Sequence, residues 1–245
     1  MPHIQEEPSF SAPAEEHSFA GLLFDMDGTI IDSTDAIVKH WHKLGNQLGV
    51  DPAVILATSH GRRSIDVLAL YDPSLATWDF VSTAEGLIPK QFGADATEIP
   101  GSRALLDALE AAGAPWAIVT SGTRPLVTGW LDVMKLAHPR YIVTAEDVER
   151  GKPDPACYAL GAEKLRAGAR KGGDGYLVLE DAPAGVRAGK AAGFKVCALA
   201  TTHTIPQLVE AGADWVVRDM RSVRLAGWER KSGVVRVEIV DALVA

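Results

Sequence analysis

The feature that most constrains this chain covers residues 21–33, with the sequence GLLFDMDGTIIDS. It begins with an apolar run typical of a buried strand and then reaches two carboxylates, Asp25 and Asp27, just before Gly28. Residues i and i+2 of an extended chain point to the same side, so both carboxylates can face one spot. An acidic pair is most often a solvated turn. Beside a buried strand, however, it needs a proton or a cation, such as a divalent metal.

Length and charge narrow the class of protein. The chain has 245 residues, enough for one large domain or for a domain with a smaller insert. Its net charge of −8 argues against a nucleic-acid partner, which normally binds a basic surface. Cys157 and Cys197 lie in neither a metal nor a redox spacing, which is typical of free thiols. With no secretory signal or membrane-length apolar run, we expect no membrane partner and a cytoplasmic protein, a monomer in the simplest case.

The first half of the chain predicts a tail, a strand and a helical block. Residues 1–18 are rich in Pro, Glu and Ser, which predicts a mobile tail. A strand is expected over residues 19–24. Ser33 or Thr34 is expected to cap a helix that runs to about residue 48. Further helices are expected over residues 52–57, 64–70 and 78–92, with no strand between them. We therefore expect a small helical domain over residues 34–97, inserted between the core segments 19–33 and 98–245.

After residue 101, strands alternate with helices, which predicts a parallel sheet. A glycine-rich loop is expected around residues 168–175. Near the end, residues 235–239 alternate between apolar and polar, and with residues 223–225 they are expected to form an edge hairpin. The predicted fold class is α/β, a Rossmann-like parallel sheet core with a small inserted helical cap domain. The expected strands of the sheet are 19–24, 116–120, 141–143, 176–179, 194–199 and 214–217.

Two sites for an anion follow predicted strands, where ligands bind in open α/β sheets. Ser121 and Gly122 offer a hydroxyl and a backbone N–H at a helix start, although an ordinary helix cap is the favoured explanation when this stretch is taken alone. Lys152 precedes Pro153, which restricts its backbone to an extended conformation and so aims the side chain. Most lysines are simply exposed, so Lys152 indicates an anion site only in combination with the other sites.

A third site consists of Glu180 and Asp181, two carboxylates that follow the predicted strand 176–179. Acidic residues at a helix start can serve only to stabilise the helix dipole. Oxygen ligands alone, however, are what Mg²⁺ prefers. If the strands are neighbours in a parallel sheet, these carboxylates and those of Asp25 and Asp27 lie at the same edge.

In this order, the four sites resemble the four motifs of the haloacid dehalogenase-like superfamily, whose phosphatases form an aspartyl-phosphate intermediate. The resemblance covers about residues 19–217, and the helical insert resembles the cap of that family. Shorter stretches are similar to glycerol-phosphate phosphatases and 2-deoxyglucose-6-phosphate phosphatases. They are SHGRR at residues 59–63, EGLIP at 85–89, TSGTR at 120–124 and EDAPAG at 180–185.

The resemblance implies a role for each acidic residue. Asp25 would be the nucleophile that attacks phosphorus. Asp27 would protonate the leaving alcohol and then activate water. Asp25, the backbone carbonyl of Asp27 and Asp181 would hold Mg²⁺, with Glu180 in a supporting position.

The resemblance also implies the residues that bind the substrate. Ser121, the N–H of Gly122 and Lys152 would bind the phosphate oxygens. The residues of the cap expected to select the substrate are His60, Arg63 and Glu85.

The implied function is a Mg²⁺-dependent phosphatase acting on small phosphate monoesters, with glycerol phosphate expected first and hexose 6-phosphates such as 2-deoxyglucose 6-phosphate as the alternative. A sugar-phosphate mutase of the same superfamily would share the four motifs. A receiver-like signalling module also combines acidic residues, Mg²⁺ and a lysine, but it lacks a helical domain inserted after its first strand.

Overall fold

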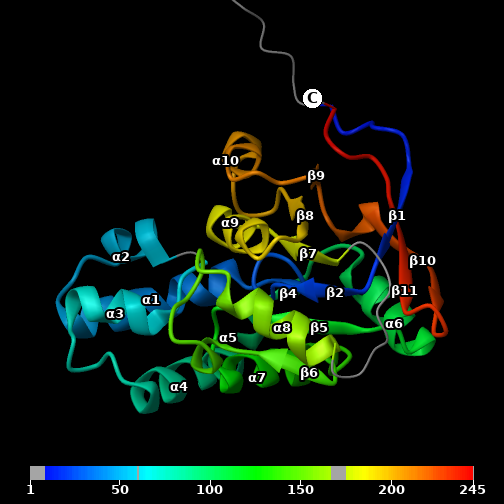
Figure 1. Cartoon of the computed structure of the whole chain (residues 1–245). Coiled ribbons are helices and arrows are strands. Elements are labelled where there is room, and N and C mark those ends of the chain that lie inside the picture. The colour runs from blue at the N-terminus through cyan, green and yellow to red at the C-terminus, as the bar shows by residue number, and fades with distance from the viewer. Residues whose placement is uncertain (1–8, 60, 167–174, 245) are drawn as a thin grey trace, which may run out of the picture.

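The computed structural model describes residues 9–59, 61–166 and 175–244. Its centre is a six-stranded sheet in the order β6-β5-β2-β7-β8-β9, with every neighbouring pair parallel (Figure 1). This sheet confirms the predicted α/β class. The strands are β2 (Gly21–Phe24), β5 (Trp116–Val119), β6 (Tyr141–Val143), β7 (Tyr176–Glu180), β8 (Lys195–Leu199) and β9 (Trp215–Val217).

Helices cover both faces of this sheet, which explains why its strands are apolar runs. In β2, Leu22 and Phe24 belong to one buried cluster and Leu23 to another, so successive side chains pack on opposite faces. Full burial of each such side chain contributes about 1.5–3 kcal/mol. The covering helices are α6 (Ser102–Ala112) and α7 (Arg124–Met134) in the first cluster, and α8 (Ala156–Arg166), α9 (Pro183–Ala191) and α10 (Ile205–Glu210) in the second.

The helical insert has an apolar cluster of its own, centred on Trp41, Leu44 and Leu68. The two chain connections to the core pair as a short ribbon of β3 (Ile31–Asp32) and β4 (Thr97–Glu98). One helix was expected across residues 78–92, but the structure has two because Pro89 cannot donate a helical hydrogen bond. The insert contains α1 (Thr34–Leu48), α2 (Pro52–Ser59), α3 (Ser64–Tyr71), α4 (Trp78–Gly86) and α5 (Ile88–Phe92).

A second sheet corrects the prediction of a mobile tail. Its three antiparallel strands lie in the order β1-β11-β10, where β1 is Glu15–Phe19, β10 is Val223–Glu229 and β11 is Val234–Ile239. The predicted edge hairpin is confirmed by the β10–β11 pairing. The tail prediction is wrong for residues 15–18, because β11 offers an open edge that β1 occupies. Residues 1–8, and residues 167–174 of the predicted glycine-rich loop, lie outside the described part of the chain.

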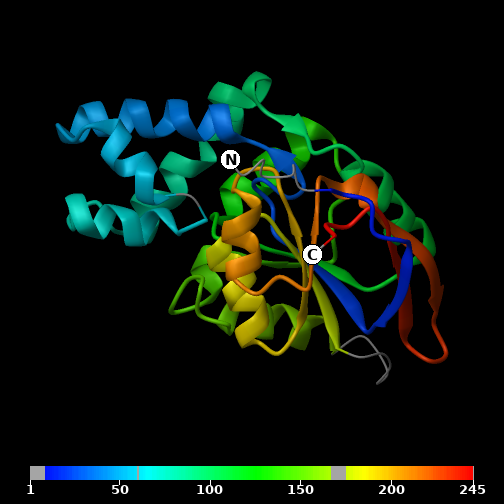
Figure 2. The ribbon, with the colours of Figure 1, turned by 90° about the horizontal axis from the view of Figure 1, so that it is seen from above.

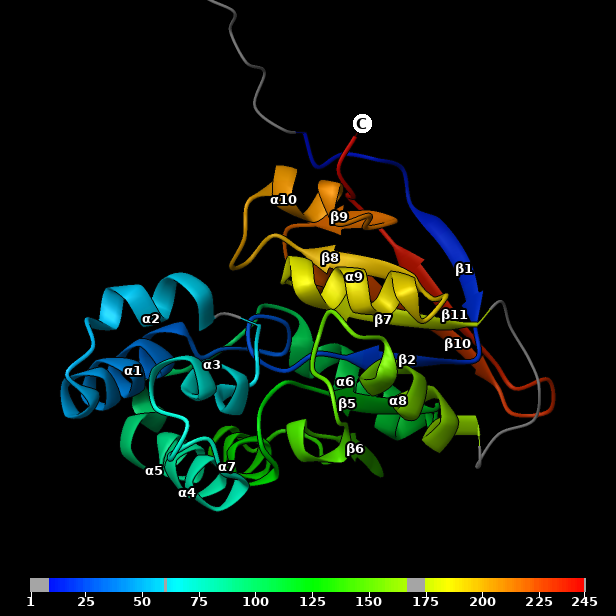
Figure 3. The same cartoon turned by 60° about the vertical axis from the view of Figure 1, so that its left-hand side comes forward.

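The cap helices α1–α3 and the antiparallel sheet lie at opposite ends of the parallel sheet (Figures 2 and 3). The cap therefore covers only one end of the core. Short 3₁₀ turns complete the described structure at Gly93–Asp95, Ala145–Asp147 and Met220–Ser222. Within the described ranges, no helix combines the length and the apolar character needed to cross a membrane.

Candidate active site

The acidic motif begins where β2 ends. The backbone N–H of Asp25 still donates to the Leu179 carbonyl of β7 at 3.0 Å, so the first carboxylate is held by the sheet itself. Gly28 then turns the chain with a φ of +88°. A Cβ at Gly28 would collide with the Asp181 carboxylate, so only glycine allows this close approach.

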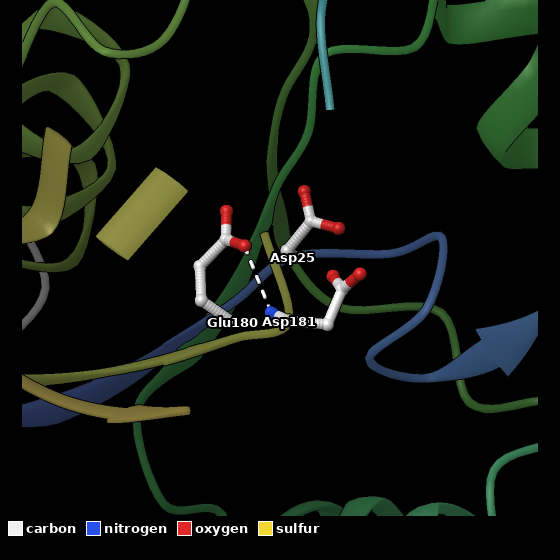
Figure 4. A group of neighbouring side chains, drawn as sticks. All are labelled: Asp25, Glu180 and Asp181. Atoms are coloured by element: carbon white, nitrogen blue, oxygen red, sulfur yellow. Dashed lines mark hydrogen bonds between the residues drawn. The ribbon is translucent and has the colours of Figure 1, made fainter. Parts of the chain in front are cut away.

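Three carboxylates gather at the ends of the neighbouring strands β2 and β7. Asp25, Glu180 and Asp181 are all buried, and each offers an oxygen within 4.8 Å of the others (Figure 4). The donor set consists of oxygens only, which suits Mg²⁺. Two hydroxyls, from Thr29 at 3.1 Å and from Thr202, donate to the Asp181 carboxylate and orient it.

Glu180 is the most heavily hydrogen-bonded of the three. One of its oxygens accepts from Lys152 Nζ at 2.7 Å and from the Tyr158 hydroxyl at 2.9 Å. The other accepts from the backbone N–H groups of Asp181 and Ala182, at 2.9 and 3.0 Å. These bonds use most of the lone pairs of a carboxylate. The arrangement fits the supporting position expected for Glu180, beside the two carboxylates expected to bind the metal.

Lys152 is the cation at the centre of the site. Its Nζ lies 2.5 Å from Asp25 Oδ1 and 2.7 Å from Glu180 Oε1, and it also donates to the Val119 carbonyl at 3.2 Å. Burial would lower the pKa of Lys152, but the two carboxylates outweigh it and raise that pKa above its ordinary value. The ammonium group therefore stays charged throughout the physiological range.

One buried lysine does not balance this many carboxylates. Burial raises the pKa of Asp25 to about 8, although Lys152 opposes the shift. Burial, reinforced by Glu180 and Asp25, also raises the pKa of Asp181 well above its ordinary value. A carboxylate cluster with raised pKa values is short of positive charge, and a divalent cation supplies it. The residues present thus fit Mg²⁺.

Asp27 lies outside this cluster and has a different partner. The Ser33 hydroxyl donates to Asp27 Oδ1 at 2.5 Å. Burial raises the pKa of Asp27, and the bond from Ser33 limits the rise. The two members of the Asp-x-Asp pair therefore have different surroundings, one beside a lysine and the other beside a hydroxyl. Such a difference is what separates a nucleophile from an acid.

A cavity of ≈ 80 Å³ lies between core and cap. Asp25, Asp27, Ser121 and Gly122 line it from the core, which brings both expected catalytic residues and part of the expected phosphate site together. Ser121 Oγ donates to the Gly61 carbonyl of the cap at 3.0 Å, and the Gly122 N–H to Thr120 Oγ1 at 3.0 Å. The cap residues that line the cavity include Ile37, Trp41, Arg62, Ser64 and Glu85.

The three residues expected to select the substrate differ in their positions. Glu85 lines the cavity, is 4% exposed, and accepts from Ser64 Oγ at 2.5 Å and from the Thr123 N–H at 2.7 Å. Burial raises the pKa of Glu85 to about 6. Arg63 is buried too, but its guanidinium is directed to other groups and does not line the cavity. His60 lies outside the described residues.

Two residues at the cavity were not selected from the sequence. Ser33 looked like a helix cap, yet its hydroxyl makes no cap bond and turns to Asp27 instead. Arg62, rather than Arg63, provides the cationic side chain of the cavity lining. The sequence contains no signal that distinguishes one of two adjacent arginines in a loop from the other.

Sequence comparisons find relatives along most of the chain. The family described as haloacid dehalogenase-like hydrolase matches residues 22–199. Glycerol-1-phosphate phosphohydrolase 1 of Saccharomyces cerevisiae is 38% identical over 228 residues, covering 91% of each chain. The 2-deoxyglucose-6-phosphate phosphatase 1 of the same yeast is 35% identical over 230 residues, covering 88% of this chain and 94% of its own.

Solved structures agree with the sequence relatives. A hydrolase from Pseudomonas syringae superposes with a TM-score of 0.68 at 25% identity, covering 82% of this chain and 94% of its own. These matches and the four motif sites at one sheet edge confirm the resemblance drawn from the sequence. The chain belongs to the haloacid dehalogenase-like hydrolases.

Proposed function

We propose that the chain is a Mg²⁺-dependent phosphatase that hydrolyses small phosphate monoesters through an aspartyl-phosphate intermediate. The observation that carries this proposal is the buried contact of Asp25 with Lys152 at 2.5 Å, beside the Asp181 carboxylate and at a cavity shared with Asp27. The relatives named as phosphatases and phosphohydrolases support it.

In the first step, an Asp25 carboxylate oxygen attacks phosphorus and forms a new P–O bond while the bond to the leaving alcohol oxygen breaks. Asp27 gives that oxygen its proton. When bound by Asp25 and Asp181, Mg²⁺ would supply positive charge to the phosphate oxygens. Lys152 adds fixed positive charge beside the nucleophile. Charge stabilisation of this kind accounts for most of the catalysis in phosphoryl transfer.

In the second step, Asp27 takes a proton from water, and the resulting hydroxide attacks the phosphorus of the aspartyl phosphate. The P–O bond to Asp25 breaks, which frees inorganic phosphate and restores the Asp25 carboxylate, while Asp27 carries a proton again. The raised pKa of Asp27 supports its protonated start, and the Ser33 hydroxyl stabilises the ionised form that follows the first step.

For the substrate we propose glycerol phosphate, with hexose 6-phosphates as the alternative. Relatives named for glycerol 1-phosphate and for 2-deoxyglucose 6-phosphate support both classes. The cavity of ≈ 80 Å³ has room for about three water molecules at a liquid volume of about 30 Å³ each, which favours the smaller ester. In this proposal Arg62 and Glu85 face the alcohol part, as a donor and an acceptor for its hydroxyls.

The test is release of inorganic phosphate by the purified chain from a panel of small phosphate esters with Mg²⁺. Accumulating phosphate supports a phosphatase, whereas conversion of one sugar phosphate into another without its release would identify a mutase. A monomeric state and a cytoplasmic location stay predictions, to be checked by light scattering and by localisation of the tagged protein.

A further inference from the structure

Arg63 belongs to the cap, yet its guanidinium is bound mainly by the core. The side chain is buried, with 6% of the residue exposed, and pairs with Asp66 through Nε at 2.7 Å and Nη2 at 2.8 Å. Its remaining N–H groups donate to three backbone carbonyls of the core, those of Ala145 at 3.5 Å, Val148 at 2.9 Å and Glu149 at 3.1 Å.

These contacts engage every donor that an arginine has. A guanidinium carries five N–H groups in a fixed plane, and each of the five has an acceptor here. A contact from Arg63 to the substrate would therefore break one of these buried bonds. Breaking a buried charge-assisted hydrogen bond costs about 1.5–3 kcal/mol. Arg63 thus connects the cap to the core at this point.

The carbonyls that Arg63 holds lie on the segment that leads to Lys152. Residues 145–151 connect β6 to this lysine. At Gly151 a Cβ would lie 2.7 Å from Arg63 Nε and 3.0 Å from its Cδ, so the backbone passes directly against the guanidinium. The same segment is tied to the loop that holds Ser121 and Gly122, because the Ala145 N–H donates to the Gly122 carbonyl at 3.0 Å.

We propose that Arg63 is a positioning residue, in which the cap clamps residues 145–151 and so holds Lys152 against Asp25 and Glu180. Lys152 can contact both carboxylates only while its backbone stays in place, and the cap supplies part of that restraint. Closure of the cap and assembly of the charged site are then one event. This inference rests on the proposed function insofar as Lys152 acts on the phosphate, but the clamp itself is independent of substrate.

Hydrogen exchange tests the clamp without any assay of activity. In Arg63→Ala, amides of residues 145–154 are expected to exchange at least about tenfold faster than in the wild type, equivalent to 1.4 kcal/mol of lost protection. Methylguanidinium added at millimolar concentration should slow the exchange again, because it refills the space left by the side chain. Arg63→Lys should behave like Arg63→Ala, since a lysine lacks the planar fork.

The matched control is Arg150→Ala, which removes an exposed arginine from the same segment. Among the residues that the structure describes, Arg150 pairs only with Asp154, at 3.1 Å, and its side chain is 80% exposed. This variant should leave the exchange of residues 145–149 within twofold of the wild type. Equal exchange in Arg63→Ala and the wild type would overturn the clamp, as would equally fast exchange in both arginine variants.

Kinetics then separate a positioning residue from a substrate contact. Positioning of Lys152 affects the phosphate common to all substrates, so Arg63→Ala should lower kcat/KM about equally for glycerol phosphate and an aryl phosphate, and by tenfold or more. Inhibition by inorganic phosphate should weaken in parallel. A loss confined to glycerol phosphate would instead make Arg63 a substrate contact. If the wild type hydrolyses neither ester, the proposed function fails while the exchange result still decides the clamp.

Discussion

Lys152 Nζ lies 2.5 Å from Asp25 Oδ1, although 127 residues separate them in the chain. The parallel sheet explains why two residues so far apart in the sequence are in contact. Strands β2, β5 and β7 are neighbours, so the segments after them meet at one edge. Lys152 reaches this edge from the segment after β6 and also donates to the Val119 carbonyl at the end of β5. The ion pair therefore forms because the sheet brings four motifs that are far apart in the sequence into one site.

Asp25→Asn is expected to abolish phosphate release, by about 10⁴-fold or more, because an amide cannot act as the carboxylate nucleophile. The fold should survive, since Lys152 keeps Glu180 as its buried partner. Phosphate release and a thermal melt measure the two effects. Asp107→Asn, at an exposed position of α6, is the control and should change neither. Near-normal turnover in a folded Asp25→Asn protein would remove this residue from its role.

Mg²⁺ is expected to stabilise the folded chain because it offsets the repulsion among Asp25, Glu180 and Asp181. At a hundredfold excess over its Kd, a bound ion contributes about 2.7 kcal/mol. In a chain of this length that amounts to roughly 5–10 °C in Tm. Asp181→Asn should lose most of the shift.

Activity should also disappear on chelation and fall when Ca²⁺ is in excess, because Ca²⁺ accepts a looser shell that would occupy the Asp25 carboxylate. A melt without any response to Mg²⁺, together with full activity after exhaustive chelation, would contradict both predictions.

The sequence was sufficient to predict the sheet and the residues at its edge. Apolar runs ending in polar residues predict buried parallel strands, and the carboxyl ends of such strands necessarily share an edge. The sequence alone therefore assigns Asp25, Asp27, Ser121 and Asp181 to one region. The position of Lys152 is harder to predict, because it depends on a loop that follows the strand.

Contacts between segments far apart in the sequence could not be predicted in this way. Composition predicted a mobile tail over residues 1–18, but the partner of β1 lies more than 200 residues away in β11, where no local pattern points to it. Arg63 and Arg62 are adjacent in a loop, and only the packing of the cap against residues 145–149 decides which of them faces the cavity.

Ser33→Ala is expected to lower kcat for esters with a poor leaving group more than for an aryl phosphate. The Ser33 hydroxyl donates to Asp27 at 2.5 Å, and its loss leaves the proposed acid without the partner that stabilises its ionised form. An activated leaving group needs little help from an acid. Comparing the two substrates measures the effect, with Ser33→Thr as a control that keeps the hydroxyl. Equal losses on both substrates would contradict this role.

Glu85→Gln is expected to make the chain more stable than the wild type near pH 8 and equally stable near pH 4. Burial raises the pKa of Glu85 from 4.5 to about 6, so the folded state holds its proton more tightly than the unfolded state. The wild type therefore loses stability as the pH rises from about 4.5 through 6, by about 2 kcal/mol in total. Glutamine stays neutral and can still accept from Thr123 and donate to the Ser64 oxygen.

Denaturant melts of both proteins between pH 4 and pH 8 measure this difference. Glu163→Gln, at an exposed position of α8, is the matched control and should follow the wild type. A gap between Glu85→Gln and the wild type that stays constant across this range would show that the carboxyl of Glu85 does not titrate there.

Arg62→Ala is expected to lower kcat/KM for glycerol phosphate more than for an aryl phosphate. Arg62 provides the cationic side chain that the cap presents to the cavity, where it can donate to the hydroxyls of a polyol. An aryl leaving group has no such hydroxyls, so its hydrolysis should fall less than threefold while that of glycerol phosphate falls about tenfold, or 1.4 kcal/mol in transition-state binding. The wild type should also prefer glycerol phosphate to 2-deoxyglucose 6-phosphate, because the larger sugar needs more room in the cavity. A tenfold preference for the hexose ester would show that the cap opens further than this structure, and equal losses on both esters would place Arg62 at the phosphate instead.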